Sequence, residues 1–124
     1  MGNDTEPLFL QIARLIQDQI MDGELEPGER APSMNELAAF HSINPATARK
    51  GLTLLVETGV LERRRGIGMF VTEGARERIV GKRREDFAGN YIAPLIDEAL
   101  RLGYARADLH DLIDRVAESR GMYQ

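Results

Sequence analysis

The chain has 124 residues, of which 43% are hydrophobic, and its formal net charge is −4. This length suits one small domain with or without an appendage, and this composition supports a packed core. Because the chain has no cysteine, no apolar run of the roughly 18 residues that cross a bilayer and no signal-peptide pattern at its start, we expect a cytoplasmic protein without disulfides or membrane contact.

The first predicted helix begins near Pro7 and ends before Gly23. Asp4 or Thr5 can cap it, and Pro7 suits the first turn because its missing N–H costs nothing there. Apolar residues at helical spacing form the expected buried face: Leu8, Ile12, Leu15, Ile16 and Ile20.

A turn at Pro27-Gly28 and a short extended piece ending at Pro32 precede the second helix, predicted for residues 35–41. Ser33 and Glu36 have the spacing of a capping box, in which the hydroxyl and the carboxylate satisfy amides at a helix start. We expect this helix to be short, with Leu37, Ala38 and Phe40 as its apolar contribution.

The third helix is predicted to begin at Asn44, a strong N-cap, with Pro45 in its first position, and to run to about residue 58. Its buried stripe is expected to comprise Ala48, Leu52, Leu55 and Val56. Two helices joined by a short turn, with the second longer and polar at its start, form a helix-turn-helix pattern.

Residues 60–71 predict a β-hairpin, because Leu61 and Arg63 alternate with Glu62 and Arg64, Gly66-Ile67-Gly68 allows a tight turn, and Met69-Phe70-Val71 returns. Strand alternation should turn Arg64 away from Arg63 and Arg65. The order of helix, short strand, helix, helix and hairpin is that of a winged helix-turn-helix.

The charge of the chain is segregated. Residues 46–66 carry a local net charge of +3, whereas Arg14 is the only basic residue before Gly28. A segregated field can steer an anionic partner toward an acidic protein, so the total charge does not exclude nucleic-acid binding.

Residues 73–124 contain two predicted amphipathic helices and no strand pattern. Pro94 should kink or interrupt the first of them, at about residues 75–102, and Gly103 separates it from the last. Their apolar faces comprise Phe87, Tyr91, Leu95, Ile96 and Ala99 in the first helix and Leu109, Leu112, Ile113 and Val116 in the last. Two such helices cannot enclose a core alone, so we expect these faces to meet the first domain or another subunit.

With these elements placed, the sequence resembles the GntR family of bacterial transcription regulators. The resemblance is carried by "PLFLQIARLIQDQIMDGELEPGERAPSMNELA" at residues 7–38 and "INPATARKGLTLLVETGVLERRRGIGMFV" at residues 43–71. The Ile-Asn-Pro-x-Thr form and the short tail with "RLGY" before the last helix are similar to the YtrA-like subfamily.

The resemblance implies a mainly α fold, with a winged helix-turn-helix DNA-binding domain at residues 1–72 and a helical dimerisation and effector module at residues 73–124. It further implies a sequence-specific DNA-binding regulator that binds a pseudo-palindromic operator as a homodimer, and we expect a repressor. A small effector would bind between subunits or between domains, since the tail is short for a conventional pocket. No cofactor is expected.

The resemblance also implies a DNA-facing set of residues. Ser33 would contact phosphate, and the wing tip would contribute Arg65 and Gly66. The matching start of the recognition helix comprises Asn44, Ala46, Thr47 and Arg49. At the position where the family places an arginine on DNA, this chain has Asn35, so a charge-assisted contact becomes neutral or is lost.

The residue types themselves support DNA contact. Ala46 and Thr47 are small enough to let a first turn approach base edges, Arg49 can form a bidentate contact to guanine or phosphate, and Lys50 suits a phosphate. In the wing, the leading candidate for a DNA contact is Arg65, and the second candidate is Arg63. The alternative for this region is a well-capped helix whose cations are only solvated.

A second interpretation of the whole chain is a winged-helix module that binds a protein, which the acidic balance and Asn35 favour slightly. Salt dependence of binding to a duplex separates the two interpretations. His41 and His110 stand alone without metal-ligand spacing, and no nucleophile is paired with a base, so we expect neither a metal site nor an enzyme.

Overall fold

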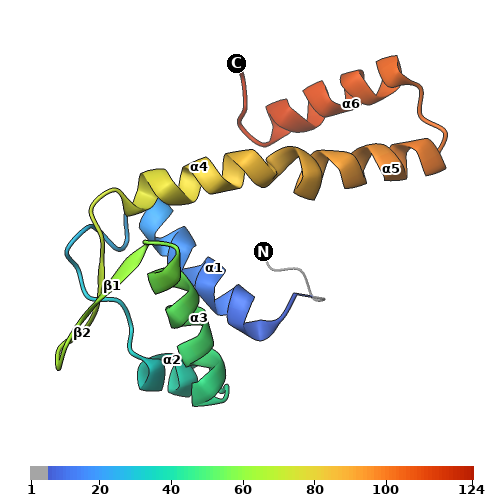
Figure 1. Cartoon of the computed structure of the whole chain (residues 1–124). Coiled ribbons are helices and arrows are strands. Elements are labelled where there is room, and N and C mark those ends of the chain that lie inside the picture. The colour runs from blue at the N-terminus through green and yellow to red at the C-terminus, as the bar shows by residue number, and fades with distance from the viewer. Residues whose placement is uncertain (1–5) are drawn as a thin grey trace. The chain divides into compact units, whose positions relative to one another are not determined.

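The computed structural model describes residues 6–124 and has the mainly helical fold that the sequence predicts (Figure 1). The chain divides into two compact units, one ending at Arg83 and the other spanning residues 84–124. The cap predicted at Asp4 or Thr5 lies outside the described residues.

Helix α1 (Leu8–Met21) forms one side of the core of the first unit. Its buried residues are Ile12, Ala13, Ile16 and Ile20. Leu8 and Leu15 were predicted for the same face, but their side chains are 53% and 45% exposed, so this part of the prediction is wrong. At about 100° per residue around the helix axis, both side chains lie just outside the sector that the buried residues occupy, where the contacts of α1 with the core end.

Helix α2 (Met34–His41) begins with the predicted capping box, which is confirmed. The Ser33 hydroxyl accepts a hydrogen bond of 3.1 Å from the Glu36 amide, and the Ser33 amide donates one of 2.8 Å to the Glu36 carboxylate. The helix ends at Ser42, which has a left-handed backbone with φ of 55°. Of the three apolar residues expected to pack from this helix, Leu37 is buried and Ala38 half-buried, whereas Phe40 is 84% exposed, so the prediction is wrong for Phe40.

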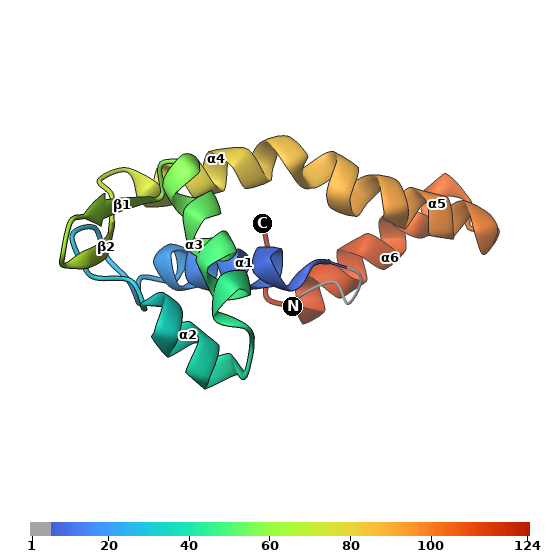
Figure 2. The same ribbon diagram turned by 60° about the horizontal axis from the view of Figure 1, so that its bottom comes forward.

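Helix α3 (Pro45–Glu57) crosses α1 (Figure 2). Its buried residues are Ala48, Gly51, Leu52 and Leu55. The crossing is closest at Gly51, where an added Cβ would lie 2.8 Å from the Phe9 carbonyl oxygen and 3.3 Å from Cγ2 of Ile12. Glycine therefore permits a backbone approach that any side chain at this position would obstruct.

The wing consists of strands β1 (Leu61–Arg64) and β2 (Gly68–Val71), paired antiparallel with Leu61 opposite Val71. The Ile67 amide donates to the Arg64 carbonyl oxygen across the turn, and Gly66 takes the positive φ of 76° that this turn requires. The predicted hairpin is confirmed.

Residues 28–31, which we call the bracing segment, add a further row of hydrogen bonds to the wing. Arg30 and Phe70 form an antiparallel bridge. Three backbone hydrogen bonds support it: the Gly28 amide to the Val71 oxygen at 2.8 Å, the Val71 amide to the Glu29 oxygen at 2.9 Å, and the Ala31 amide to the Met69 oxygen at 2.8 Å. Strand β2 is therefore hydrogen-bonded along both edges, to β1 on one and to the bracing segment on the other.

Helix α4 (Ala75–Phe87) attaches to the first unit by its N-terminal half, where Ala75 and Ile79 are buried. The Arg78 guanidinium donates hydrogen bonds to the Gly59 carbonyl oxygen at 3.1 Å, the Thr72 hydroxyl at 3.1 Å and the Glu73 carbonyl oxygen at 2.9 Å. These bonds join the start of α4 to the loops on either side of the hairpin.

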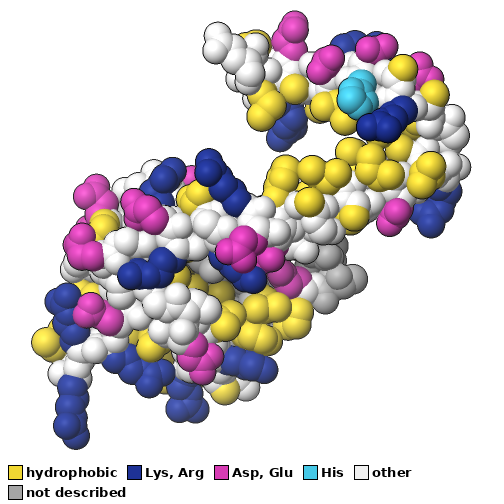
Figure 3. All heavy atoms as spheres, turned by 45° about the horizontal axis from the view of Figure 1, so that its top comes forward, with side chains coloured by type: hydrophobic (Ala, Val, Ile, Leu, Met, Phe, Trp, Pro, Cys, Tyr) yellow, Lys and Arg dark blue, Asp and Glu magenta, His cyan; other side chains and the backbone are white. Residues whose placement is uncertain are grey.

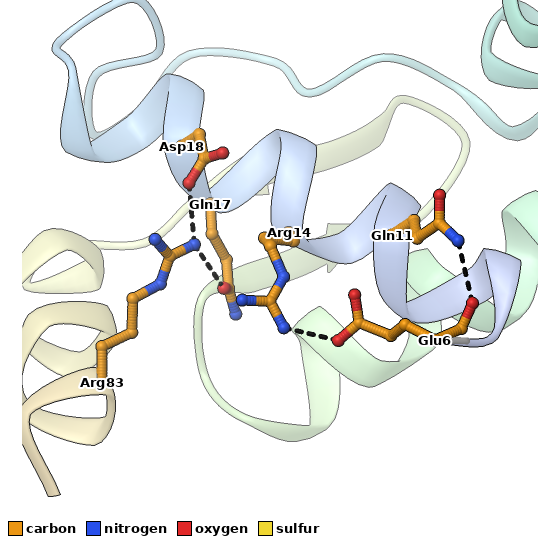
Figure 4. Close-up of polar contacts among 6 residues, drawn as sticks. All are labelled: Glu6, Gln11, Arg14, Gln17, Asp18 and Arg83. Atoms are coloured by element: carbon orange, nitrogen blue, oxygen red, sulfur yellow. Dashed lines mark hydrogen bonds and ion pairs between the residues drawn. The ribbon is translucent and has the colours of Figure 1, made fainter. Parts of the chain in front are cut away.

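A second attachment of α4 lies on the side of α1 (Figure 4). The Arg83 guanidinium donates to the Asp18 carboxylate at 2.8 Å and to the Gln17 side-chain oxygen at 3.0 Å. In the same view, Arg14 of α1 forms an ion pair with Glu6, just before the helix.

The second unit contains η1 (Ala88–Ile92), α5 (Ala93–Arg101) and α6 (Arg106–Ser119). Pro94 was predicted to kink or interrupt a helix at about residues 75–102. The structure accommodates it with the π-helical turn η1, in which the Ala93 amide donates to the Ala88 carbonyl oxygen. Proline removes a regular helical hydrogen bond, and the wider turn keeps the helix continuous around it.

Candidate nucleic-acid interface

The start of α3 presents a polar face to solvent. The Asn44 side-chain oxygen accepts a hydrogen bond of 2.8 Å from the Ala46 amide, which confirms the predicted cap and leaves the Asn44 amide group free to donate. Asn44, Ala46 and Arg49 are exposed and Thr47 is half-buried, whereas Ala48 is fully buried. The first turn of α3 therefore separates a core-facing side from a side that another molecule can reach.

Lys50, the predicted phosphate contact next to Arg49, is exposed but has an internal partner. Its ammonium nitrogen lies 4.1 Å from the centroid of the Phe9 ring of α1, in a cation–π arrangement. This contact gives Lys50 a structural role that Arg49 does not have.

The start of α2 lies beside this face. The Ser33 hydroxyl oxygen already accepts from the Glu36 amide, and its hydrogen can donate either to the Glu36 carboxylate or to an external oxygen such as that of a phosphate. The hydrogen bonds from Ser33, backbone first and side chain second, hold the pKa of Glu36 below its usual value. Asn35 is exposed, one position into the helix.

The wing arginines take different positions, as strand alternation predicts. Arg63 donates a hydrogen bond of 3.2 Å to the Thr53 hydroxyl of α3, so it stays close to the recognition helix. The Arg64 guanidinium lies 4.1 Å from the centroid of the Phe70 ring. Arg65 and Gly66 are exposed at the hairpin turn. Of the three arginines, Arg65 is the one with no intramolecular partner among the described residues.

Residues 8–71 match the family described as bacterial regulatory proteins, gntR family. The matched range covers the three helices and the wing described above. The chain belongs to the gntR family.

Relatives of similar length support the same assignment. The transcriptional regulator YhcF of Bacillus subtilis is 28% identical over 114 residues, which cover 92% of this chain and 93% of YhcF. The transcriptional repressor YtrA of Bacillus subtilis is 28% identical over 111 residues, covering 90% of this chain and 85% of YtrA. These matches extend beyond the winged helix into the helical tail.

Solved structures give the same result. A GntR family transcriptional regulator from Listeria monocytogenes superposes with a TM-score of 0.70 at 26% identity, covering 92% of this chain and 98% of that chain. The DNA-binding domain of AraR, in complex with operator ORR3, superposes with a TM-score of 0.53 at 30% identity, covering 58% of this chain and 88% of that domain.

This gntR-family chain is a DNA-binding transcription regulator. The rival interpretation, a winged-helix module that binds protein instead of DNA, is not supported. In the described part of the chain, no helix is long and apolar enough to span a membrane, and no group of three His, Cys, Asp or Glu side chains is placed to hold a metal ion.

Two features of this regulator's interface were missed from the sequence. Arg30, in the bracing segment, borders the same pocket of about 320 Å³ as Arg49 and Arg63. Gly51 sets the distance between α3 and α1. Both depend on contacts between residues far apart in the chain, and the local pattern around each carries no signal of them.

The residues predicted for dimerisation lie on four elements of the tail: Phe87 ends α4, Tyr91 is in η1, Leu95 and Ile96 are in α5, and Leu109, Leu112, Ile113 and Val116 are in α6. Leu109 is buried and Leu112 half-buried. The other six are 40% to 57% exposed. Apolar side chains line the facing sides of α5 and α6 (Figure 3), and only Ala99 and Leu109 are buried among residues 84–124.

Proposed function

We propose that this regulator is a homodimeric repressor that binds a pseudo-palindromic operator through the start of α3 and the tip of the wing. The observation that carries the proposal is the exposed, capped start of α3, with Arg49 beside it and Arg65 at the wing tip. Arg49 is suited to a guanine edge or a phosphate, and Arg65 to a groove or a phosphate. The repressor assignment is supported by YtrA, which is named a repressor and matches most of the chain.

Selection of bound duplexes from a random library tests this proposal. A dimer with one recognition helix per subunit should enrich inverted half-sites about one helical turn, roughly 10 base pairs, or more apart. A collection without an inverted repeat would contradict the dimeric operator.

Arg49→Ala tests the recognition helix. If Arg49 forms a bidentate contact, the substitution should weaken binding to the enriched site by about 1–3 kcal/mol for each half-site and relax preference at one base pair in each half-site. Arg101→Ala is the matched control, because within residues 6–124 the recorded partner of Arg101 is Glu98, on the surface of α5. Equal affinity of both variants would remove Arg49 from the interface, and a lowered melting temperature for Arg49→Ala alone would make it structural.

The dimer is supported by the apolar side chains that residues 84–124 leave exposed. A surface of this kind, in a unit with two buried side chains, is characteristic of an interface. Ile113 is 43% exposed, so Ile113→Asp can disrupt an interface without removing a core residue. We expect this variant to sediment as a monomer, while Ile67→Asp, at the wing tip, remains dimeric. A dimeric Ile113→Asp variant would place the interface elsewhere.

The proposal includes a small-molecule effector, of unknown identity, that binds between subunits and releases the DNA. It places the regulator in the cytoplasm, where bacterial operators are, and assigns it no catalytic activity. A compound that lowers DNA affinity should also raise the melting temperature of the free dimer, because it binds the folded state.

A further inference from the structure

We propose that Arg30 is an additional DNA-contacting residue of this regulator and that its guanidinium binds a backbone phosphate next to Ser33. This inference rests on the proposed operator binding. It supplies a cation near the start of α2, where Asn35 stands in place of the family's arginine.

The backbone of Arg30 is fixed by the wing. The amides of Gly28 and Ala31 on its two sides donate to β2 at 2.8 Å each, and Arg30 itself bridges Phe70. Arg30 is therefore part of the wing structure although it lies in the loop between α1 and α2, well before β1 in the chain.

The side chain of Arg30 lies across Gly68. A Cβ added at Gly68 would be 2.9 Å from Nε of Arg30, so the absence of a side chain in β2 makes room for the guanidinium. The position of the cation is thus restricted before any partner binds, which reduces the entropy cost of a contact.

Two other arginines border the same pocket as Arg30. Arg30, Arg49 and Arg63 come from the bracing segment, α3 and β1, and they border one pocket together with Ser33. The floor of this pocket includes the apolar residues Leu52 and Met69. Three like charges around one pocket repel each other, and an anion bound there would relieve this repulsion.

Within the described part of the chain, no carboxylate forms an ion pair with the three arginines. Glu36 is close enough for Arg30 to act on its charge, but the Glu36 carboxylate accepts the hydrogen bond from the Ser33 amide. The cluster is therefore available to an external anion.

A phosphate fits this place better than a base edge. Ser33, which borders the same pocket, offers a hydroxyl hydrogen, and both donors lie beside α2 and not at the first turn of α3 that approaches the bases. Phosphate contacts fix the register of a protein on DNA without reading sequence. Arg30 should therefore contribute affinity to every duplex equally.

The salt dependence of binding to a mixed-sequence duplex tests this inference. For a fluorescein-labelled duplex of about 30 base pairs, the log–log slope of affinity against salt falls by about 0.9 for each phosphate contact removed. Because a homodimer carries two copies of Arg30, Arg30→Gln should lower the slope by about 1.8, so that its loss of affinity between about 50 and about 200 mM KCl is roughly 12-fold smaller than that of the wild type. Arg30→Lys should keep the wild-type slope.

Arg120→Gln, an exposed change of the same charge in the tail, is the control and should keep the wild-type slope. If Arg30→Gln lowers thermal stability, Arg30→Met, which retains the aliphatic stem over Gly68, takes its place. A wild-type slope for the Arg30 variant, while Arg49→Ala lowers it, overturns the role of Arg30 and leaves operator binding intact. A wild type that fails to bind the duplex at low salt overturns both proposals.

Discussion

Gly51→Ala is the change that most directly probes the packing of the recognition helix. The new methyl group would lie 2.8 Å from the Phe9 carbonyl oxygen and 3.3 Å from Cγ2 of Ile12. The first contact is with backbone, which cannot rotate away, so α1 or α3 must shift. Overpacking of this kind costs about 1–3 kcal/mol, and the backbone contact places this site in the upper part of that range.

The higher helix propensity of alanine opposes this loss, because it stabilises a helix by about 1 kcal/mol relative to glycine. The expected net loss is therefore about 1–2 kcal/mol, which in a unit of this size lowers the melting temperature by roughly 5–15 °C. Because α3 is the proposed recognition helix, a shift of α3 should also lower the DNA affinity measured below the melting transition.

Gly81→Ala is the matched control for this prediction. Gly81 lies in α4, and a Cβ there would meet no atom within 4 Å. This variant should be stabilised by about 0.5–1 kcal/mol, the ordinary gain of alanine in a helix. Differential scanning calorimetry of both variants checks the pair. A Gly51→Ala variant as stable as Gly81→Ala would refute the close contact between α1 and α3.

Three further predictions concern local contacts. Arg83→Ala should lower stability by at most about 1 kcal/mol, because its pair with Asp18 is partly exposed, and should increase hydrogen exchange in α4. Arg84→Ala, at an exposed position of the same helix, should do so less. Because folding lowers the pKa of Glu36, its carboxylate stabilises the fold at pH values above the unfolded-state pKa of 4.5, and this stabilisation is lost as the pH falls below 4.5 and through the folded-state pKa. Glu36→Gln should therefore flatten the acid limb of a stability-against-pH curve. Ser42→Gly should raise the melting temperature, because Ser42 has a φ of 55°, and an unchanged value would argue against a strained backbone there.

The sequence predicted those parts of the structure that local chemistry determines. The capping box at Ser33, the Asn44 cap and the turn at Gly66 each depend on residues within four positions, and each formed as expected. The order of these elements was enough to predict the winged helix-turn-helix fold. The dimerisation residues and the DNA contacts remain predictions.

The sequence did not predict features that depend on distant pairs. The bridge between Arg30 and Phe70 joins segments with no shared pattern, and the contact of Gly51 with Phe9 requires knowing how two helices cross. The exposure of Leu15 has the same origin, since helical periodicity finds an apolar face but not the width that neighbouring elements cover. Lys50 shows that an exposed cation can also have an internal partner.

The bracing segment changes what counts as a transferable part of this regulator. If residues 61–71 of a relative replaced those of this chain, residues 28–31 would remain those of this chain. The grafted β2 would then pair with a bracing segment that belongs to a different hairpin. Residues 28–31 would have to be exchanged with it. Substitutions in that segment can therefore alter operator affinity in a chimera whose recognition helix and hairpin are both intact.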